Sequence, residues 1–490
     1  MMRIILLAAL SFILTFLFAN PLTAQPSTEN RPPNIVLIVA DDHGREALGC
    51  YGNKAVKTPA IDGLASEGTR FSNAFCTSAS CSPSRSVLLT GMQNHANGMY
   101  GLEHQQHHFK SFDAVKSLPV LLQKAGYRTA RVGKFHVAPE QVYHFERVLQ
   151  EGAVNNPASI GRSPVVMADI CKPYINDKSG KPFFLYYAPD DPHRSNSIQP
   201  DGKVIFDGMK ANAFANKAEG YPQVTKKVFN PAEVIVPAYL PDNKATREEL
   251  AEYYQAISRL DQGVGRLLEH LKASGQYDNT LVIYLSDNGA PFPGSKTTLY
   301  DAGMQLPFII KLPGAQKKGF VQDAMISWVD ITPTLLDFAG ALPGNAQLQG
   351  RSFRKIIEQD NVTGWDEVYG SHSLHEITMY YPMRVLRERR LKLIYNIAHE
   401  LQFPMALDLY HSYTWQNMLK TKGTNLGRRS TEAYLHRPRF ELYDIQTDPE
   451  ELHNLAGDPA YDQELKRMTD KLKRFQKDTH DMWISKWVFE

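Results

Sequence analysis

Residues 34–40 read Asn-Ile-Val-Leu-Ile-Val-Ala and lead directly into Asp41-Asp42-His43-Gly44. After Asn34 the run is apolar at every position and rich in β-branched side chains, which is typical of a parallel strand buried on both faces. Ligands of parallel sheets gather at the carboxyl ends of the strands, where the two acidic residues stand. The stretch therefore predicts the centre of an α/β sheet and the edge of that sheet where a site is expected.

A second apolar run repeats this pattern, because Thr280–Ser286 leads into Asp287-Asn288-Gly289. Buried carboxylates are costly unless a cation neutralises them. Two strand ends that carry only oxygen donors predict a site for a hard divalent cation, and no Cys/His spacing of the zinc type accompanies them. A solvated turn is the alternative for either strand end taken alone.

Helical and strand patterns alternate around these two runs. We expect helices at 117–125, from a capping box at Thr246 and Glu249 to Gly275, and at 331–338, and strands at 127–132, 182–188 and 306–311. This order predicts an α/β fold with a mostly parallel central sheet flanked by helices.

From about Trp365 the pattern changes to short strands. They are expected at 367–370, 383–386, 391–395 and 441–445, and a helix follows at 462–475. We therefore expect a catalytic domain at 25–364 and a smaller C-terminal α+β domain with an antiparallel sheet at 365–490. The insert at 201–242 shows little periodicity and is expected to be a surface loop over the pocket.

Residues 1–24 combine Arg3, an apolar run and small residues near their end, which predicts a cleaved signal peptide and an exported protein without a stable membrane anchor. An uncleaved anchor is the alternative. The formal net charge of the 490 residues is +2. Such a balance gives no broad basic field, so a nucleic-acid partner is not indicated.

The most informative stretch is Cys81-Ser-Pro-Ser-Arg85-Ser-Val-Leu-Leu-Thr-Gly91. A polar loop followed by an apolar run places Cys81 near the N-terminus of a buried helix, where free backbone N–H groups favour an anion. Arg85, one turn further, adds a planar donor fork suited to a tetrahedral oxyanion. A buried structural cysteine is the alternative for Cys81 considered alone.

This stretch resembles the C-x-P-S-R and L-T-G signature of the type I sulfatases, which depend on formylglycine and have an alkaline-phosphatase-like fold. The resemblance implies that a maturation enzyme reads Pro83 and Arg85 and oxidises Cys81 to formylglycine (3-oxoalanine). The hydrate of this aldehyde then supplies the nucleophilic oxygen. The resemblance also implies one Ca²⁺ ion, held by Asp41, Asp42, Asp287, Asn288 and the modified Cys81.

The same resemblance implies which side chains handle the sulfate. Gly133-Lys134-Phe135-His136 matches the family's G-K-x-H motif, in which the lysine contacts the sulfate and the histidine helps to eliminate it. His193 matches the histidine near the leaving group. Lys296 matches the second sulfate-binding cation, although Asp301-Ala302-Gly303 follows Tyr300 where the family often has Glu-Gly-Gly. A surface lysine and a structural histidine are the alternative for Lys134 and His136.

A narrower resemblance, to the N-sulfoglucosamine sulfohydrolases (sulfamidases), is carried by 97–102, 107–109, 191–194, 261–265, 381–384 and 479–483. It implies hydrolysis of the N-linked sulfate of glucosamine in heparan sulfate. Candidate sugar contacts are His107, His108, Asp191, His375, Glu376 and Arg384, and ordinary polar contacts between domains are the alternative for the last three.

Other functions remain open from the sequence. An O-sulfatase acting on another sulfated glycan or an aryl sulfate would share all the core residues. A glycan-binding protein without catalysis would have no need of an oxidisable Cys81, and a phosphatase would more naturally carry Ser or Thr there. The expected partners are a sulfated saccharide and the maturation enzyme, with a homodimer as a further option.

Overall fold

The computed structural model describes residues 32–153, 155–198, 204–205, 210–344 and 347–488. The expected signal peptide at 1–24 lies outside these residues. The chain from Pro32 onward forms one compact unit. Across the described ranges, none of the helices has the length and apolar character needed to cross a bilayer.

The central sheet is built around β1 (Asn34–Ala40), as the sequence predicts. Within the described residues its eight strands lie in the order β11-β2-β10-β9-β1-β6-β4-β5. The pairs around β1 are parallel, whereas β10 runs antiparallel to both of its neighbours. The other strands are β2 (Thr69–Phe71), β4 (Arg128–Gly133), β5 (Arg147–Glu151), β6 (Phe183–Ala188), β9 (Thr280–Ser286), β10 (Phe308–Lys311) and β11 (Phe320–Gln322).

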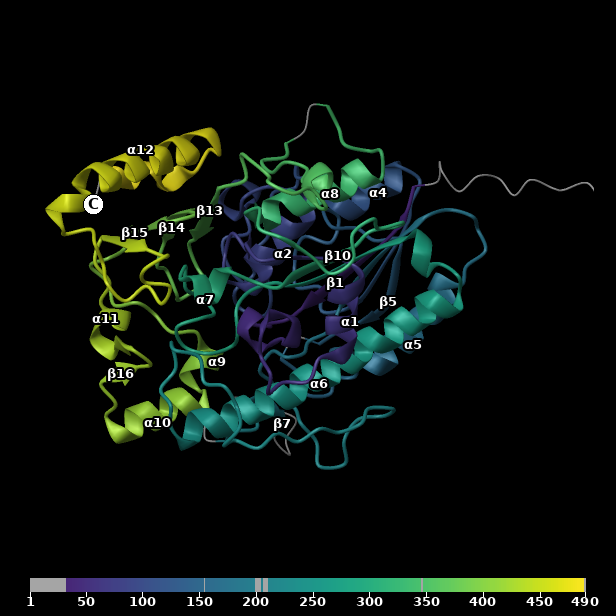
Figure 1. The fold of residues 1–490 in the computed structure, drawn as a ribbon, viewed down its shortest axis with the longest axis horizontal. Coiled ribbons are helices and arrows are strands. Elements are labelled where there is room, and N and C mark those ends of the chain that lie inside the picture. Colours follow the sequence, from purple (N-terminus) through teal and green to yellow (C-terminus); the bar gives the residue numbers. More distant parts are fainter. Residues whose placement is uncertain (1–31, 154, 199–203, 206–209, 345–346, 489–490) are drawn as a thin grey trace, which may run out of the picture. The chain divides into compact units, whose positions relative to one another are not determined.

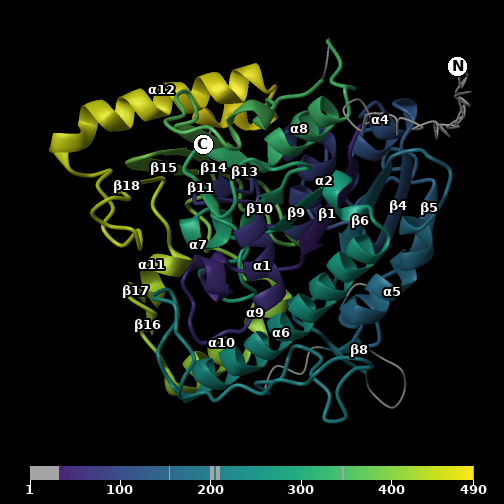
Figure 2. The same cartoon turned by 45° about the vertical axis from the view of Figure 1, so that its right-hand side comes forward.

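Helices cover both faces of this sheet because β1 is apolar on both sides (Figures 1 and 2). Ile35, Leu37 and Val39 belong to a core that includes residues of α2 (Cys81–Thr90), α4 (Leu118–Lys124) and α8 (Ile331–Phe338). Val36 and Ile38 belong to a second core with α1 (Pro59–Glu67), α5 (Pro164–Ile175) and α6 (Lys244–Ala273). The strand that the sequence places at the centre is thus buried on both faces.

One helix begins differently from the sequence expectation. The side chain of Asn243 caps α6 by accepting a hydrogen bond from the Thr246 N–H at 3.0 Å, so the helix starts before the expected capping box. Glu249 is fully buried and accepts hydrogen bonds from Arg194 and from the Thr414 N–H instead. The glutamate of the expected box therefore ties α6 to the C-terminal part of the chain.

The C-terminal part carries an antiparallel sheet in the order β13-β14-β15-β18. Its strands are β13 (Glu367–His372), β14 (Met383–Glu388), β15 (Leu391–Asn396) and β18 (Phe440–Asp444), and α12 (Asp462–Asp478) packs on it through Met468 and Leu472. Smaller elements are β3 (Ala74–Phe75), β7 (Ser197–Ile198), β8 (Val204–Ile205), β12 (Ile326–Ser327), β16 (Asn425–Leu426), β17 (Arg429–Ser430), α3 (Asn94–Asn97), α7 (Asp301–Met304), α9 (Leu407–Tyr410), α10 (Tyr413–Thr421) and α11 (Thr431–Leu435). The domain boundary expected after residue 364 stays a prediction.

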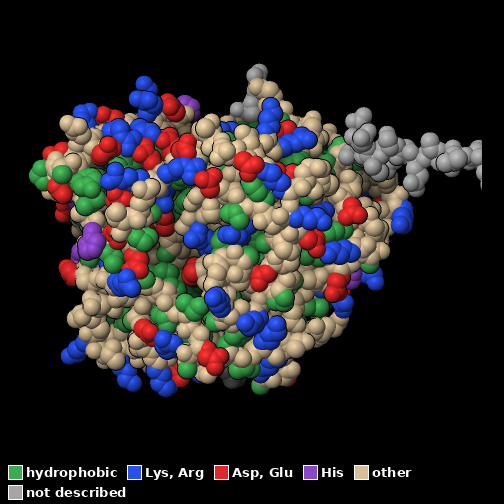
Figure 3. All heavy atoms as spheres, viewed as in Figure 1, with side chains coloured by type: hydrophobic (Ala, Val, Ile, Leu, Met, Phe, Trp, Pro, Cys, Tyr) green, Lys and Arg blue, Asp and Glu red, His purple; other side chains and the backbone are tan. Residues whose placement is uncertain are grey.

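Basic and acidic side chains are interspersed over the face of the molecule shown in Figure 3. This face therefore presents no broad patch of one charge to an anionic ligand.

Candidate active site

The two acidic strand ends meet because β1 and β9 are adjacent and parallel, with Ala40 paired to Ser286. The Asp42 N–H donates to Asp287 Oδ1 at 3.1 Å, and Asn288 Nδ2 donates to Asp42 Oδ1 at 2.6 Å. Asp41 and these three residues are at most 1% exposed. The sheet thus brings together the four oxygen-bearing side chains that the sequence singles out.

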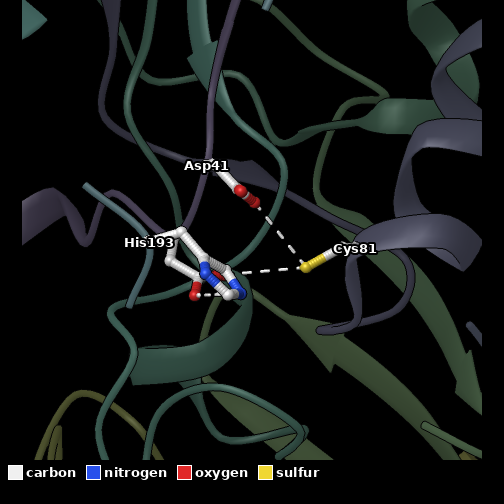
Figure 4. A group of neighbouring side chains, drawn as sticks. Asp41, Cys81 and His193 are labelled. Carbon is white, nitrogen blue, oxygen red and sulfur yellow. Dashed lines mark hydrogen bonds and ion pairs between the residues drawn. The ribbon is translucent and has the colours of Figure 1, made fainter. Parts of the chain in front are cut away.

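Cys81 is the first residue of α2 and lies against these carboxylates. Its Sγ is 3.7 Å from Asp41 Oδ1 and 3.8 Å from Asp42 Oδ1. Figure 4 shows the sulfur pointing toward Asp41, with the His193 ring beside them. The possible metal-ligand atoms of Asp41, Asp42, Cys81 and His193 lie within 4.8 Å of one another. The closeness of His193 to the carboxylates is a feature that sequence spacing did not indicate.

The strand ends fit a hard divalent cation. Burial, and then repulsion by Asp41 and Asp287, raise the pKa of Asp42 to about 7 although Lys296 acts in the opposite direction. Asn288 Oδ1 is buried and has no hydrogen-bond partner. Crowded carboxylates and an orphaned amide oxygen form a donor set that suits calcium or magnesium better than zinc.

Arg85 is fully buried and its guanidinium group contacts the carboxylates of Asp41 and Asp287. Its Nε donates to Asp287 Oδ2 at 2.8 Å, its Nη2 lies 3.5 Å from Asp41 Oδ1, and its Nη1 donates to the Tyr186 hydroxyl at 3.1 Å. Arg85 does not line the pocket whose walls include Cys81, Lys134 and Lys296. The sequence expectation of a direct contact with an oxyanion therefore differs from the structure, in which Arg85 positions Asp41 and Asp287.

Two buried lysines face the pocket beside Cys81. Lys134 Nζ donates to Asp41 Oδ2 at 2.7 Å. It follows Gly133, whose φ of +83° and close approach to the Ala188 carbonyl leave no room for a Cβ. Lys296 Nζ donates to Asp42 Oδ2 at 2.9 Å. Both ammonium groups are thus held at the edge of the acidic cluster.

The histidines are fixed by defined partners. His193 Nδ1 donates to the Arg194 carbonyl at 2.5 Å, so Nε2 of the neutral ring accepts from Lys296 Nζ at 3.0 Å. Burial, followed by Lys296, lowers the pKa of His193 well below its usual range. His136 has a φ of +59° and places Nε2 2.6 Å from Nδ1 of His104, a pocket residue that sequence reasoning missed.

The candidate sugar contacts divide into two groups. His107, His375 and Glu376 line the pocket, together with residues that the sequence did not mark: Leu102, His104, Gln105, Gln106, Asn155, Leu407 and Asp408. His108 is exposed and does not line it. The described residues of the insert at 201–242 do not line it either.

Asp191 and Arg384 differ from the expectation of a sugar contact. Asp191 is fully buried and accepts two hydrogen bonds from Arg259, each 2.7 Å long. Arg384 is fully buried and donates to Asp481 at 2.5 and 2.8 Å. Both charged groups are paired with buried partners inside the protein, so neither side chain is available to bind a saccharide.

A thiol at a helix N-terminus, oxygen-rich strand ends and two buried lysines define a hydrolase site for an anionic ester or amide. The chain belongs to the sulfatase family, because the Sulfatase family model matches residues 33–341. The model for the C-terminal region of N-sulphoglucosamine sulphohydrolase matches residues 294–409.

The chain is 41% identical over 471 residues to the N-sulphoglucosamine sulphohydrolase of Homo sapiens. This alignment covers 93% of this chain and 92% of that protein. It is 31% identical over 453 residues to an ulvan-active sulfatase of Formosa agariphila. That alignment covers 90% of this chain and 80% of the relative. The expected membership in the sulfatases is thereby confirmed.

Solved structures show the same fold. One, described as a complex with its substrate D-glucosamine-2-N,6-O-disulfate, matches with a TM-score of 0.65 at 22% identity, covering 92% of this chain and 99% of that chain. A phosphonate monoester hydrolase of Agrobacterium radiobacter matches with a TM-score of 0.64 at 20% identity, covering 91% and 96%. The expected architecture, a mostly parallel sheet with a smaller antiparallel part, is confirmed.

Proposed function

We propose that this chain hydrolyses the N-linked sulfate of glucosamine residues in saccharides of the heparan sulfate type. One observation carries the proposal: Cys81 lies against Asp41 and Asp42 beside two buried lysines, in a chain that is 41% identical over 93% of its length to an N-sulphoglucosamine sulphohydrolase. The active form contains formylglycine at residue 81 and one Ca²⁺ ion held by Asp41, Asp42, Asp287 and Asn288.

The lysines and the strand ends bind the sulfate group. Lys134 and Lys296 are buried and supply fixed positive charge for its oxygens, and buried charge is worth more than charge in water. Arg85 keeps Asp41 and Asp287 in place. When present, formylglycine supplies the nucleophilic oxygen and the cation draws electron density away from the sulfate.

The histidines manage protons. Because Nδ1 of His193 is bound to the Arg194 carbonyl, proton exchange with the leaving atom occurs at Nε2, the atom that Lys296 contacts. His136 lines the same pocket, and its Nδ1 has no hydrogen-bond partner. That nitrogen is available to take the proton whose loss accompanies release of sulfate.

The location and partners follow from the same proposal. The chain is exported by residues 1–24, and a maturation enzyme that reads Cys81, Pro83 and Arg85 installs the aldehyde. Mass spectrometry of the secreted protein tests both points through its N-terminus and the peptide that carries residue 81. Sedimentation of this protein tests whether a homodimer forms.

Substrate choice is tested with the matured enzyme and its Cys81→Ala variant. Free sulfate is measured after incubation with N-sulfoglucosamine, 6-O-sulfated N-acetylglucosamine and a chromogenic aryl sulfate. Release from N-sulfoglucosamine that depends on Cys81 is the expected result. Release from an O-sulfated compound alone would keep the sulfatase chemistry and refute the sulfamidase assignment.

A further inference from the structure

Asp408 is an acidic pocket residue that the mechanism above does not use. It lies on α9 and is 6% exposed. Its Oδ1 accepts the Leu409 N–H at 2.8 Å, which fixes the carboxylate. Its Oδ2 is 2.8 Å from Lys296 Nζ and 3.9 Å from His193 Nε2. The C-terminal part of the chain thus places a rigid carboxylate beside the reacting groups.

The position of Asp408 relative to Cys81 identifies which part of a substrate it meets. Lys296 Nζ donates both to Asp42, which contacts Cys81, and to Asp408. An oxygen at residue 81 that attacks sulfur in line requires the leaving atom on the opposite side of the sulfur. Proton exchange with the leaving atom is assigned above to His193 Nε2, which lies 3.9 Å from Asp408 Oδ2, so the leaving atom lies beside the wall of the pocket that contains Asp408.

The two classes of sulfate differ in what the leaving atom offers. In a sulfamate the bridging nitrogen carries a hydrogen, whereas the bridging oxygen of a sulfate ester carries only lone pairs. The overall reaction R–NH–SO₃⁻ + H₂O → R–NH₃⁺ + SO₄²⁻ breaks the S–N bond, leaves the electron pair on nitrogen and adds two protons there. A carboxylate beside this atom accepts hydrogen bonds throughout, whereas beside an ester oxygen it is repulsive.

Asp408 is ionised in this environment. Burial alone would raise its pKa, but the positive charge of Lys296 outweighs burial and lowers the pKa below its usual range. An ionised carboxylate only accepts hydrogen bonds, so it cannot adapt to an ester oxygen by donating one.

We propose that Asp408 selects N-linked over O-linked sulfate by accepting hydrogen bonds from the nitrogen that leaves. This inference rests on the proposed function and names the side chain that makes the pocket specific for nitrogen. It assigns a role to a residue of the C-terminal part of the chain.

The test compares two substrates that differ only in the bridging atom, glucosamine 2-N-sulfate and glucose 2-O-sulfate. Values of kcat/KM are measured for the matured wild type, Asp408→Asn and, as a matched control, Glu376→Gln. Glu376 is the other carboxylate of this wall, and its Oε1 accepts the Leu407 N–H at 2.8 Å. Asp408→Ser replaces the amide variant if that variant does not accumulate as folded protein.

We expect Asp408→Asn to lower kcat/KM for the N-sulfate about 10- to 100-fold and to change the O-sulfate value by less than about threefold. Glu376→Gln should affect both substrates by the same factor. Product inhibition adds a readout without catalysis: glucosamine should inhibit the wild type more tightly than glucose, and Asp408→Asn should lose this difference.

An equal loss on both substrates would overturn the inference, because Asp408 would then act only by holding Lys296. Unchanged discrimination between glucosamine and glucose would overturn it as well. A wild type that releases sulfate only from the O-sulfate refutes the proposed function itself, and the inference with it. A wild type that cleaves the N-sulfate while the variant keeps the same N-to-O ratio refutes the inference alone.

Discussion

The strand-end cluster and the Arg384–Asp481 pair are both buried groups of charge, and they differ in how completely their polar atoms are bonded. Asp481 accepts from Arg384, from Gln476 Nε2 at 2.9 Å and from the Trp483 N–H at 3.1 Å. At the strand ends, Asn288 Oδ1 has no partner. The carboxylate of Asp481 thus has all its partners within the protein, whereas the strand-end cluster has an acceptor left for a ligand.

The pKa values follow the same difference. Burial alone would raise the pKa of Asp481, but Arg384 outweighs it and holds the value well below the usual range. Burial and neighbouring carboxylates raise the pKa of Asp42 to about 7. Buried charge by itself therefore does not identify a site, and what marks the strand ends is a raised carboxyl pKa together with an amide oxygen that has no partner.

The largest effect is expected for Cys81→Ala. Sulfate release should fall about 10⁴-fold or more, because the nucleophile is lost. The melting temperature should change by less than about 2 °C, since one small buried side chain replaces another. Cys171→Ala, at a buried cysteine of α5, is the matched control and should keep its activity. A large loss of stability in Cys81→Ala would contradict the view that this cluster is built for a ligand.

Arg384→Met should act in the opposite way. Removing the arginine leaves Asp481 buried without its partner, which costs about 3–5 kcal/mol of unfolding free energy in urea titrations. The kcat/KM of the folded fraction should stay within about threefold of wild type. Replacing Asp481 by Leu in the same chain should restore much of the stability. A selective loss of saccharide turnover would bring back the sugar contact that the sequence suggested.

Calcium removal should have an intermediate effect. At a free concentration about a hundredfold above Kd, bound ion stabilises the folded chain by about 2.7 kcal/mol, so chelation should lower the melting temperature by several degrees. In Asp42→Asn this shift should shrink, and the metal-free variant should melt at or above the metal-free wild type because carboxylate repulsion is relieved. An identical calcium shift in both proteins would show that the ion binds elsewhere.

The smallest effect concerns acid. Because the pKa of Asp481 is depressed in the folded state, its contribution to stability is full above the unfolded value of about 3.9 and declines as the pH falls below it. The stability difference between wild type and Asp481→Asn should therefore narrow from about pH 6 to about pH 3. Urea unfolding at several pH values measures it, and a constant difference would exclude an ionic origin.

Much of the fold is readable from the sequence because the central strands are long, apolar and followed by acidic residues. Residues 34–40 and 280–286 form strands with the expected bounds. Their adjacency follows from topology and explains why Asp41, Asp42, Asp287 and Asn288 meet. The signature beginning at Cys81 added the helix N-terminus that faces them.

What the sequence could not give was the partner of each charged side chain. Nothing in the local pattern distinguishes Arg384, which is bound by Asp481 far along the chain, from an arginine that faces a pocket. Asp408 stands in a stretch without periodicity, so its place beside Lys296 depends on long-range packing. His104 was missed for the same reason, because its contact with His136 joins two loops.

The complete burial of α2 also has a consequence for the proposed conversion of Cys81 to formylglycine. Every residue from Cys81 to Thr90 is buried in the folded chain. The maturation enzyme proposed above would reach Cys81, Pro83 and Arg85 only before the chain folds. On this proposal, the time between emergence of this segment and collapse of the sheet around it limits how many molecules become active, and mutations that accelerate folding would lower the yield of active enzyme.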